Sequence, residues 1–441
     1  MICLHCMQGS VATGGVCPVC RHPDEDKTRP PHALPWRYEL RERYIIGKVV
    51  GSGGFGITYF AYDTRNRKKV AVKELFPKTA AQPERTPDNS LVICEGQNDF
   101  FRVMALRFRN EAETLAHLNN HPEFPDVYGI LHANGTLYYI MEALDGKDLK
   151  RIMADRSGAP IPWQSLCDVI KPIFRALDCI HQKGMLHRDI SPDNIFVMNA
   201  GGAKLIDFGS IRSYVSQEEM TTNIMHQQYA APEQLPQGGL MNGGELVPQM
   251  TYTDIYSLSV VLYYILTGVK VPPAFQRFIN PQVILRAPNE VNSAVPPYVS
   301  AAIYRGVQMN PADRWQNVRD YAAALFPGED IFRANITRPQ TRMFRLVCTR
   351  GAFPGQACPI RPGLRLTIGH MSDNSIAIPD KQISRYHCEL QGTPDGKLYL
   401  RDLGSANHTY LNGQPLPPGN WYQLKFGDAI RLGESQFLEI Q

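Results

Sequence analysis

The sequence predicts a multidomain chain with a small cysteine-rich head, a body of mixed helices and strands, and an all-β tail. Four of the ten cysteines lie within the first 20 residues. The body alternates between strand-like and helix-like apolar periods, whereas the C-terminal part shows short alternating segments separated by turn signals. A length of 441 residues is sufficient for two or three domains, each with its own core.

Two polar segments that contain prolines divide the chain. They predict domains at 1–22, 44–326 and 343–441, joined by linkers at 23–43 and 327–342. The net charge of +4 gives no indication of a nucleic-acid partner. The N-terminus lacks the pattern of a secretory signal, and no apolar run reaches the roughly 18 residues of a membrane span. We therefore expect a soluble, cytoplasmic protein.

The head contains two C-x-x-C pairs, Cys3 with Cys6 and Cys17 with Cys20. Each pair can place two thiolates on one tight turn, and two facing turns complete a tetrahedral sulfur site. The head has too few apolar residues for a core, so Zn²⁺ would supply most of its folding free energy. The spacing resembles a zinc ribbon with a structural Zn²⁺. A redox dithiol pair, or thiols without a role, are the alternatives.

The body begins with a strand-like segment that leads into a glycine-rich turn containing Gly51, Gly53, Gly54 and Gly56. Two further strand-like segments follow, and the second of them, VAVKEL, contains Lys73. A dinucleotide-binding fold would instead place a helix directly after the glycines. Glycines allow backbone N–H groups to approach phosphates closely. We therefore predict a phosphate-binding turn between two strands, with Lys73 within reach of the same phosphates.

A helical pattern over residues 101–118 places Glu111 in one apolar stripe with Met104 and Phe108. A carboxylate on an apolar face needs a counter-charge, and so does a buried lysine. This reasoning predicts an ion pair between Lys73 and Glu111. The alternative is a different helix register, in which the acid is a cap or a surface charge.

Two carboxylates and an amide follow in two short motifs, HRDISPDN and KLIDFG. Phosphoryl transfer requires a metal ion that bridges the phosphates and a carboxylate that orients and deprotonates the accepting hydroxyl. Asn194 and Asp207 suit Mg²⁺ or Mn²⁺ as ligands. Asp189 suits the substrate hydroxyl.

With these motifs in order, residues 44–326 resemble the eukaryotic-type Ser/Thr protein kinase family in its bacterial form. The resemblance implies an α+β fold of two lobes, ATP and Mg²⁺ as cofactors, and transfer of the γ-phosphoryl group to Ser or Thr hydroxyls of protein substrates. It also implies an adenine site formed by the hinge and by apolar residues above and below it: Met141, Glu142, Leu144, Ala71 and Phe196.

The same resemblance implies supporting roles for residues later in the body. Glu233, in the motif Ala-Pro-Glu, is expected to pair with Arg314, and Asp254 is expected to brace the catalytic loop. Thr221 and Thr222 lie in the segment that ends at Glu233, and we expect autophosphorylation there. Ordinary polar loop residues are the alternative for the two threonines.

Ser191 departs from the family pattern, because Ser/Thr kinases usually have a lysine there that helps to neutralise the transferring phosphate. A hydroxyl can donate a hydrogen bond but brings no charge. The alternative function is therefore a catalytically weak kinase that acts as a phospho-dependent scaffold. The complete set of Asp189, Asn194 and Asp207 favours the enzyme, and the complete activation segment disfavours a small-molecule kinase of the same fold.

The tail, residues 343–441, has alternating strand-like segments and turn signals typical of an all-β sandwich. Its motifs around Ser384, Arg385 and Asn407 resemble the forkhead-associated (FHA) family, which implies binding of phosphothreonine proteins, the chain itself included. Ser384 and Arg385 would contact the phosphate and Asn407 the peptide backbone. His370 stands where the family has an arginine, so we expect weaker binding, or binding that depends on pH if His370 substitutes as an imidazolium. A sandwich that serves docking or self-association is the alternative.

Overall fold

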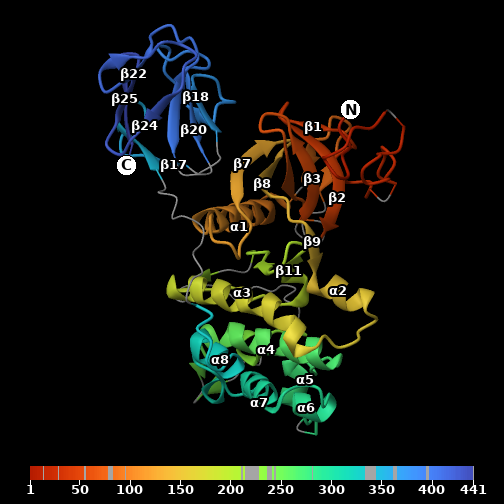
Figure 1. Cartoon of the computed structure of the whole chain (residues 1–441). Helices are drawn as coiled ribbons and strands as arrows, with labels where there is room; N and C mark the ends of the chain where they lie inside the picture. Colours follow the sequence, from red (N-terminus) through yellow and green to blue (C-terminus); the bar gives the residue numbers. More distant parts are fainter. Residues whose placement is uncertain are drawn as a thin grey trace. The chain divides into compact units, whose positions relative to one another are not determined.

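A computed structural model gives two compact units, Met1–Arg333 and Ala334–Gln441 (Figure 1). The first unit contains the head and the body, and the second contains the tail. The structure describes residues 1–12, 14–27, 29–53, 56–77, 83–94, 96–209, 212–213, 228–235, 241–242, 245–280, 282–332, 344–360, 365–393 and 397–440.

The body begins with a lobe built on a six-stranded antiparallel sheet, with the strand order β1-β2-β3-β4-β8-β7. Its strands are β1 Glu39–Leu40, β2 Tyr44–Ser52, β3 Gly56–Asp63, β4 Lys68–Leu75, β7 Val127–Ala133 and β8 Thr136–Glu142. Side chains on β3 alternate between buried and partly buried, as expected for a strand with one face on a core. The glycine-rich turn joins β2 to β3, and Lys73 lies on β4.

Helix α1, Asn98–His117, packs against β4, β7 and β8 of this sheet (Figure 1). Its buried residues include Met104, Phe108 and Glu111, so the apolar stripe of the sequence is the face that contacts the sheet. The packing of this one face positions a carboxylate at the boundary of the lobe.

The second lobe of the body is mainly helical, and α4 is buried along almost its whole length. A helix that is apolar on all sides belongs in the interior of a lobe. The helices are α2 Leu149–Asp155, α3 Trp163–Gln182, α4 Thr251–Thr267, α5 Ala274–Ile279, α6 Pro288–Val291, α7 Pro297–Gly306 and α8 Val318–Leu325. Among the helices of the described residues, none is both long enough and apolar enough to cross a membrane.

Short strands and 3₁₀ turns complete this lobe and carry the catalytic motifs. The sheet β12-β11-β9 holds the segments on either side of the motif loops. These elements are β9 Gly146–Asp148, β10 Met185–Leu186, β11 Ile195–Met198, β12 Ala203–Leu205, β13 Arg212–Ser213, β14 Met241–Asn242, β15 Glu245–Leu246, η1 Pro192–Asn194, η2 Pro232–Gln234 and η3 Pro311–Asp313.

Arg314 is fully buried and joins η2 to the end of the helical lobe. Its Nη1 and Nη2 donate to the Glu233 carboxylate at 2.9 and 3.0 Å. Its Nε and Nη2 also donate to the backbone oxygens of Gln308 and Met309, at 2.7 and 2.8 Å. Thr253 donates a third hydrogen bond to Glu233 at 2.7 Å. Both buried charges thus have hydrogen-bond partners within the protein.

The head packs directly on the sheet of the first lobe. The backbone N–H of Lys48 on β2 donates to the oxygen of Leu4 at 3.3 Å, and Leu4 is fully buried. Segment 23–43 contains β1, and its residues Ala33 and Leu34 lie in the core of the lobe. Head, segment 23–43 and sheet therefore form one packed structure, and the exact domain boundaries stay predictions.

The sequence between β4 and α1 includes a short hairpin formed by β5, Glu84–Arg85, and β6, Leu91–Val92. Arg85 donates to Glu74 at 2.9 Å and to the backbone oxygen of His32 at 2.9 Å. Glu74 is fully buried and also accepts hydrogen bonds from Tyr59 and Tyr138, at 2.5 and 2.7 Å. The hairpin supplies the cation that a buried carboxylate requires.

The second unit is a sandwich of two sheets, ordered β17-β16-β26-β25-β22-β23 and β19-β18-β20-β21-β24. One apolar core lies within it, with Ile368, Leu390, Leu400, Leu432 and Ile440 among its most buried members. The strands are β16 Phe344–Arg350, β17 Ala357–Ile360, β18 Arg365–Gly369, β19 Ile376–Ala377, β20 Cys388–Gly392, β21 Leu398–Asp402, β22 Thr409–Leu411, β23 Gln414–Pro415, β24 Tyr422–Leu424, β25 Ala429–Leu432 and β26 Gln436–Ile440. The predicted all-β tail is confirmed.

Replacing Arg314 with alanine is expected to destabilise the first unit strongly. The change leaves the Glu233 carboxylate buried without its cation, and the loss of one partner of a buried ion pair costs about 3–5 kcal/mol. Differential scanning calorimetry of the full chain measures this loss as a lower transition temperature. As a control, Arg319→Ala removes a more exposed pair with Asp178 and should cost at most about 1 kcal/mol. Equal effects of the two changes would contradict the prediction.

Candidate active site and phosphopeptide site

Lys73, Glu111 and Asp207 meet in the first unit, although they come from β4, α1 and the loop after β12. Lys73 Nζ lies 2.7 Å from Glu111 Oε1 and 3.6 Å from Asp207 Oδ1. The hydroxyl of Tyr139 donates to Glu111 Oε1 at 2.8 Å. The Lys73 and Glu111 side chains are 16% and 6% exposed, whereas Asp207 is 50% exposed. The structure thus brings the predicted pair together and adds an exposed carboxylate beside it.

Lys73 and Asp207 support each other's charge in this cluster. Burial opposes the ammonium charge of Lys73, but the carboxylates of Asp207 and Glu111 outweigh it and raise the lysine pKa well above its usual value. In turn, the nearby Lys73 is the main cause of the lowered pKa of Asp207. At neutral pH, the lysine is therefore a cation and Asp207 an anion, which are the forms needed to bind phosphate and a divalent metal.

Asp207 has a left-handed backbone conformation, with a φ of 63°. This conformation is uncommon for residues other than glycine and persists only where the surroundings hold it. The next residue, Phe208, is buried, and its ring contacts His187 and Phe124 edge-on at centroid distances of 5.1 and 5.4 Å. The buried ring anchors the loop and leaves Asp207 directed at Lys73.

The catalytic loop brings Asn194 and Asp189 together. Asn194 Nδ2 donates to the Asp189 backbone oxygen at 2.7 Å and to its carboxylate Oδ2 at 3.1 Å. Because the amide nitrogen is used in this way, the amide oxygen is the atom that could bind a metal. Mg²⁺ prefers oxygen ligands such as this amide and the Asp207 carboxylate, so the residues present fit the metal.

Asp254, at the start of α4, supports the loop that carries Asp189 and Asn194. It is fully buried and accepts hydrogen bonds from the backbone N–H groups of His187 and Arg188, at 2.9 and 2.7 Å. It also contacts His181 Nε2 at 2.8 Å. Burial opposes its charge, but His181 and the N–H groups outweigh burial and lower its pKa. Arg188 has a φ of 66°, so these bonds hold a strained turn just before Asp189.

The glycines of the phosphate-binding turn have different local surroundings. Among the described residues, no atom lies within 4 Å of a Cβ placed at Gly51 or Gly53. At Gly56, a Cβ would lie 2.3 Å from the backbone oxygen of Glu74, so the close approach of β4 requires glycine there. Gly54 lies outside the described residues.

The predicted adenine contacts lie on β4, on β8 and the segment after it, and on β11. Ala71 is buried and pairs in register with Met141 across the two strands. Glu142 ends β8, and its carboxylate accepts a hydrogen bond from Lys204 at 2.7 Å. Leu144 and Phe196 are partly buried.

Ser191 is fully buried, and its hydroxyl has no hydrogen-bond partner among the described residues. A serine side chain at this position is shorter than a lysine side chain, and it carries no charge. The structure therefore places a small, neutral and buried side chain at this position. Thr221 and Thr222 lie outside the described residues.

The four cysteines of the head form one cluster, with all sulfur atoms within 4.8 Å of one another. The Sγ atoms of Cys3 and Cys20 are 3.6 Å apart, and those of Cys6 and Cys17 are 3.8 Å apart. A tetrahedron of Zn–S bonds of about 2.3 Å has edges of about 3.8 Å. The thiol set and its dimensions are therefore compatible with Zn²⁺.

In the second unit, loops between strands carry the predicted phosphopeptide residues. Ser384 Oγ accepts a hydrogen bond from the backbone N–H of Ala406 at 3.0 Å, and Asn407 Nδ2 donates to the Gln382 oxygen at 2.8 Å. The backbone N–H of His370 donates to the Ser384 oxygen at 3.0 Å. These bonds bring Ser384, Asn407 and His370 close to one another. The side chains of His370, Arg385 and Asn407 are exposed.

Two buried residues fix these loops. His387 Nδ1 accepts from the Ser384 N–H at 3.2 Å, and Nε2 lies 3.2 Å from the oxygen of His408. Burial lowers the pKa of His387, so the ring is neutral and can accept and donate in these two directions. Asp402 accepts five hydrogen bonds from Gly404, Ser405 and Thr409 at 2.6 to 3.0 Å. Its bracing role was not predicted, although an aspartate followed by Gly and Ser is a recognisable turn signal.

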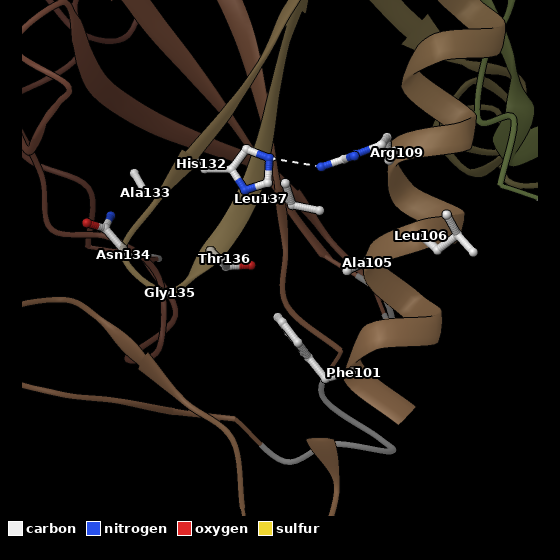
Figure 2. A pocket seen from close by; sticks show the side chains of 10 residues that line it. All are labelled: Phe101, Ala105, Leu106, Arg109, His132, Ala133, Asn134, Gly135, Thr136 and Leu137. Atoms are coloured by element: carbon white, nitrogen blue, oxygen red, sulfur yellow. Dashed lines mark hydrogen bonds between the residues drawn. The ribbon is translucent and has the colours of Figure 1, made fainter. Parts of the chain in front are cut away.

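A cavity of about 540 Å³ lies between α1 and the turn that joins β7 to β8. Figure 2 shows its lining, which includes Phe101 and Leu137 and a contact of 3.1 Å between Arg109 Nη2 and His132 Nε2. Its lining includes none of the predicted site residues. The cavity is thus separate from the cluster around Lys73.

Comparison with protein families assigns both units. The model of the protein kinase domain matches residues 44–315, more than half of the chain. The chain belongs to the protein kinase family. The model of the FHA domain matches residues 366–433 of this protein kinase. The predicted order of a kinase body and an FHA tail is confirmed.

Relatives of this protein kinase include bacterial enzymes. The serine/threonine-protein kinase PknB of Mycobacterium leprae is 31% identical over 314 residues, covering 68% of this chain and 44% of that protein. A probable serine/threonine-protein kinase of Clostridium acetobutylicum is 31% identical over 288 residues, covering 64% and 39%. This chain thus spans less than half the length of these curated relatives. The solved structure "PpkA-294 apo form" is similar with a TM-score of 0.56 and 28% identity, covering 67% of this chain and 99% of that chain.

The stability of the FHA unit is expected to fall in acid because of Asp402. Burial opposes the charge of this carboxylate, but the hydroxyls of Ser405 and Thr409 outweigh it and lower its pKa. Its stabilisation is therefore complete above the unfolded pKa of about 3.9 and is lost as the pH falls through the lower folded pKa. Thermal unfolding between pH 7 and 3 measures this slope. Asp402→Asn should lose that part of the slope, and identical slopes would contradict the prediction.

Proposed function

We propose that the chain is an ATP-dependent serine/threonine protein kinase that transfers the γ-phosphoryl group to hydroxyls of protein substrates. The observation that carries this proposal is the convergence of Lys73, Glu111 and Asp207, with Asn194 and Asp189 on the neighbouring loop. Phosphoryl transfer requires a cation, metal ligands and a base. Lys73 would be the cation, Asp207 and Asn194 the metal ligands, and Asp189 the base. The names of the relatives support the same specificity for serine and threonine.

Lys73 binds the phosphates of ATP, and Glu111 holds the lysine in position through the bond of 2.7 Å. The backbone N–H groups of Gly51 and Gly53 approach the phosphates from the turn, together with Gly54 and Gly56. Exclusion of water around the mostly buried lysine strengthens its attraction to phosphate.

Asp207 and Asn194 are the residues that would hold Mg²⁺ or Mn²⁺. Such a metal would neutralise the charge that develops on the phosphates. Asp189 accepts the proton of the substrate hydroxyl and orients its oxygen. The hydrogen bond from Asn194 to Asp189 couples the two positions, so the base and the metal ligand stay in a fixed relation.

Adenine would lie between Ala71 and Phe196 and bind the backbone of Met141, Glu142 and Leu144. The position of Ala71 opposite Met141 in the sheet supports this assignment. Ser191 contributes no charge, so Lys73 is the cation that this chain supplies to the phosphates, and a bound metal would add to its charge. We also propose Thr221 and Thr222 as sites of autophosphorylation.

Asp189→Asn is expected to reduce phosphoryl transfer by roughly 10²- to 10⁴-fold, because the amide cannot accept the proton of the hydroxyl. Transfer from labelled ATP to a general protein substrate and to the chain itself, with mapping of the modified residues, measures the effect.

Asp168→Asn is the matched control, since Asp168 is an exposed residue of α3. It should leave the rate unchanged. Equal incorporation of label by the wild type and by Asp189→Asn would contradict the proposed kinase activity. It would favour the alternative function as a phospho-dependent scaffold.

We further propose that the FHA domain binds phosphothreonine proteins, including substrates or the phosphorylated chain itself. The exposed Arg385 and His370 lie in loops fixed by His387 and Asp402, and this arrangement supports a preformed anion site. A rigid site loses little conformational entropy on binding. Ser384 Oγ and Arg385 would contact the phosphate, and Asn407 the peptide backbone.

The head, by this proposal, holds a structural Zn²⁺ through Cys3, Cys6, Cys17 and Cys20, which leaves no open coordination position. A cytoplasmic location is part of the proposal, because reduced thiolates persist in a reducing compartment. The domain limits that we propose are 1–22, 44–326 and 343–441.

Arg385→Ala is expected to weaken binding of a phosphothreonine peptide library by roughly 10- to 100-fold, because charged hydrogen bonds to phosphate are lost. Calorimetry with the full chain at pH 6 and 7.5 tests this, with the same library unphosphorylated. Lys425→Ala removes a charge from an exposed residue elsewhere in the domain and should change little. Equal binding of both libraries would favour a docking role over phosphothreonine recognition.

A further inference from the structure

Strand β2 has an irregularity just before the glycine-rich turn. Its register with β3 pairs Ile46 with Ala61 and Val49 with Tyr59, and it shifts between these pairs. Gly47 and Lys48 therefore fall outside the regular ladder, as in a β-bulge. Gly47 is buried. Buried backbone groups need hydrogen-bond partners. The backbone groups of the bulge must therefore find their partners in a segment other than β3.

The head and the segment that follows it supply these partners. The N–H of Lys48 donates to the oxygen of Leu4 at 3.3 Å. The Arg29 guanidinium donates to the oxygen of Gly47 at 3.1 and 3.0 Å. The N–H of Val49 donates to Asp26 Oδ2 at 3.3 Å, and Asp26 in turn pairs with Arg29 at 3.2 Å. Three consecutive residues of β2 are thus held from outside the sheet.

Leu4 lies so close to Gly47 that no side chain would fit at position 47 of the strand. A Cβ at Gly47 would lie 2.4 Å from the backbone oxygen of Leu4 and 2.8 Å from Met7 Cε. Leu4 is one of the two residues between Cys3 and Cys6. The first turn of the cysteine cluster therefore rests directly on the strand that leads into the phosphate-binding turn.

The position of Leu4 depends on the cysteine cluster. The core of the head consists of Cys3, Val11 and Cys17, with Cys6 and Cys20 packed against it. A core made of four cysteines and one valine buries little apolar surface, so the fold of the head depends on what binds the thiolates.

We propose that the metal-held head positions the glycine-rich strand for nucleotide binding, with Leu4, Arg29 and Gly47 as positioning residues. This inference rests on the proposed kinase function. The bulge sets the direction in which β2 enters the turn, and the head holds the bulge. Loss of the contact loosens the turn over the phosphates, so it lowers ATP affinity before it affects the chemical step.

Gly47→Ala in the full chain tests the contact without changing a cysteine. Gly129→Ala is the matched control, because Gly129 lies in the same sheet and a Cβ there would meet no atom of the described residues within 4 Å. Four quantities are measured: bound zinc, amide hydrogen exchange of residues 44–52, the affinity for a fluorescent ATP analogue, and KM and kcat for ATP.

We expect Gly47→Ala to retain its zinc and to exchange faster in residues 44–52. Its KM for ATP and its dissociation constant for the analogue should rise about three- to tenfold, which is the order of change expected from one or two backbone hydrogen bonds. The kcat should change little, because the lost interaction positions the nucleotide and does not act on the reacting atoms. Gly129→Ala should match the wild type in all four.

Wild-type protein stripped of zinc by a chelator should show the same faster exchange and weaker ATP binding, and zinc should restore both. If Gly47→Ala matches the wild type in exchange and in ATP affinity, the inference is overturned. A wild type that contains no zinc overturns the metal dependence. A chain that binds no nucleotide contradicts the kinase proposal alone, since exchange in residues 44–52 still decides whether the head holds the strand.

Discussion

The geometry of the candidate active site depends on the buried ion pair between Lys73 and Glu111. A lysine on a packed strand keeps its charge only if a carboxylate lies beside it, and the carboxylate in turn needs the lysine. The pair therefore requires α1 to pack on the sheet with one particular face. Asp207 joins the pair at 3.6 Å, so the same charge also connects the sheet lobe to the catalytic loops of the helical lobe.

Strand β4 is anchored by charges on both of its faces. Successive residues of a strand point to opposite sides, so Lys73 faces Glu111 and Asp207 and Glu74 faces the other side of the sheet. Glu74 is neutralised by Arg85 and receives hydrogen bonds from Tyr59 and Tyr138. A shift of the strand along its axis would break both sets of contacts. The hairpin after β4 thus helps to position the lysine from the opposite face of the sheet.

The two candidate sites share one principle of construction. In each, a buried acid that does not face a ligand fixes a loop through backbone N–H groups: Asp254 in the kinase domain and Asp402 in the FHA domain. In front of these braced loops, Asp207 of the kinase domain is half exposed and Arg385 of the FHA domain is exposed. Rigid support behind accessible polar groups reduces the entropy that binding would otherwise cost.

The sequence by itself determined the identity and order of the functional groups, because these are local properties. Helical periodicity placed Glu111 on a buried face, and the doubled C-x-x-C spacing indicated a metal cluster. Tertiary structure alone decided that the head rests on Gly47, that Arg85 neutralises Glu74, and that Ser191 is buried. Each of these features depends on contacts between segments that are distant along the chain, or on what packs over a residue. A local sequence pattern does not show which distant segments pack together.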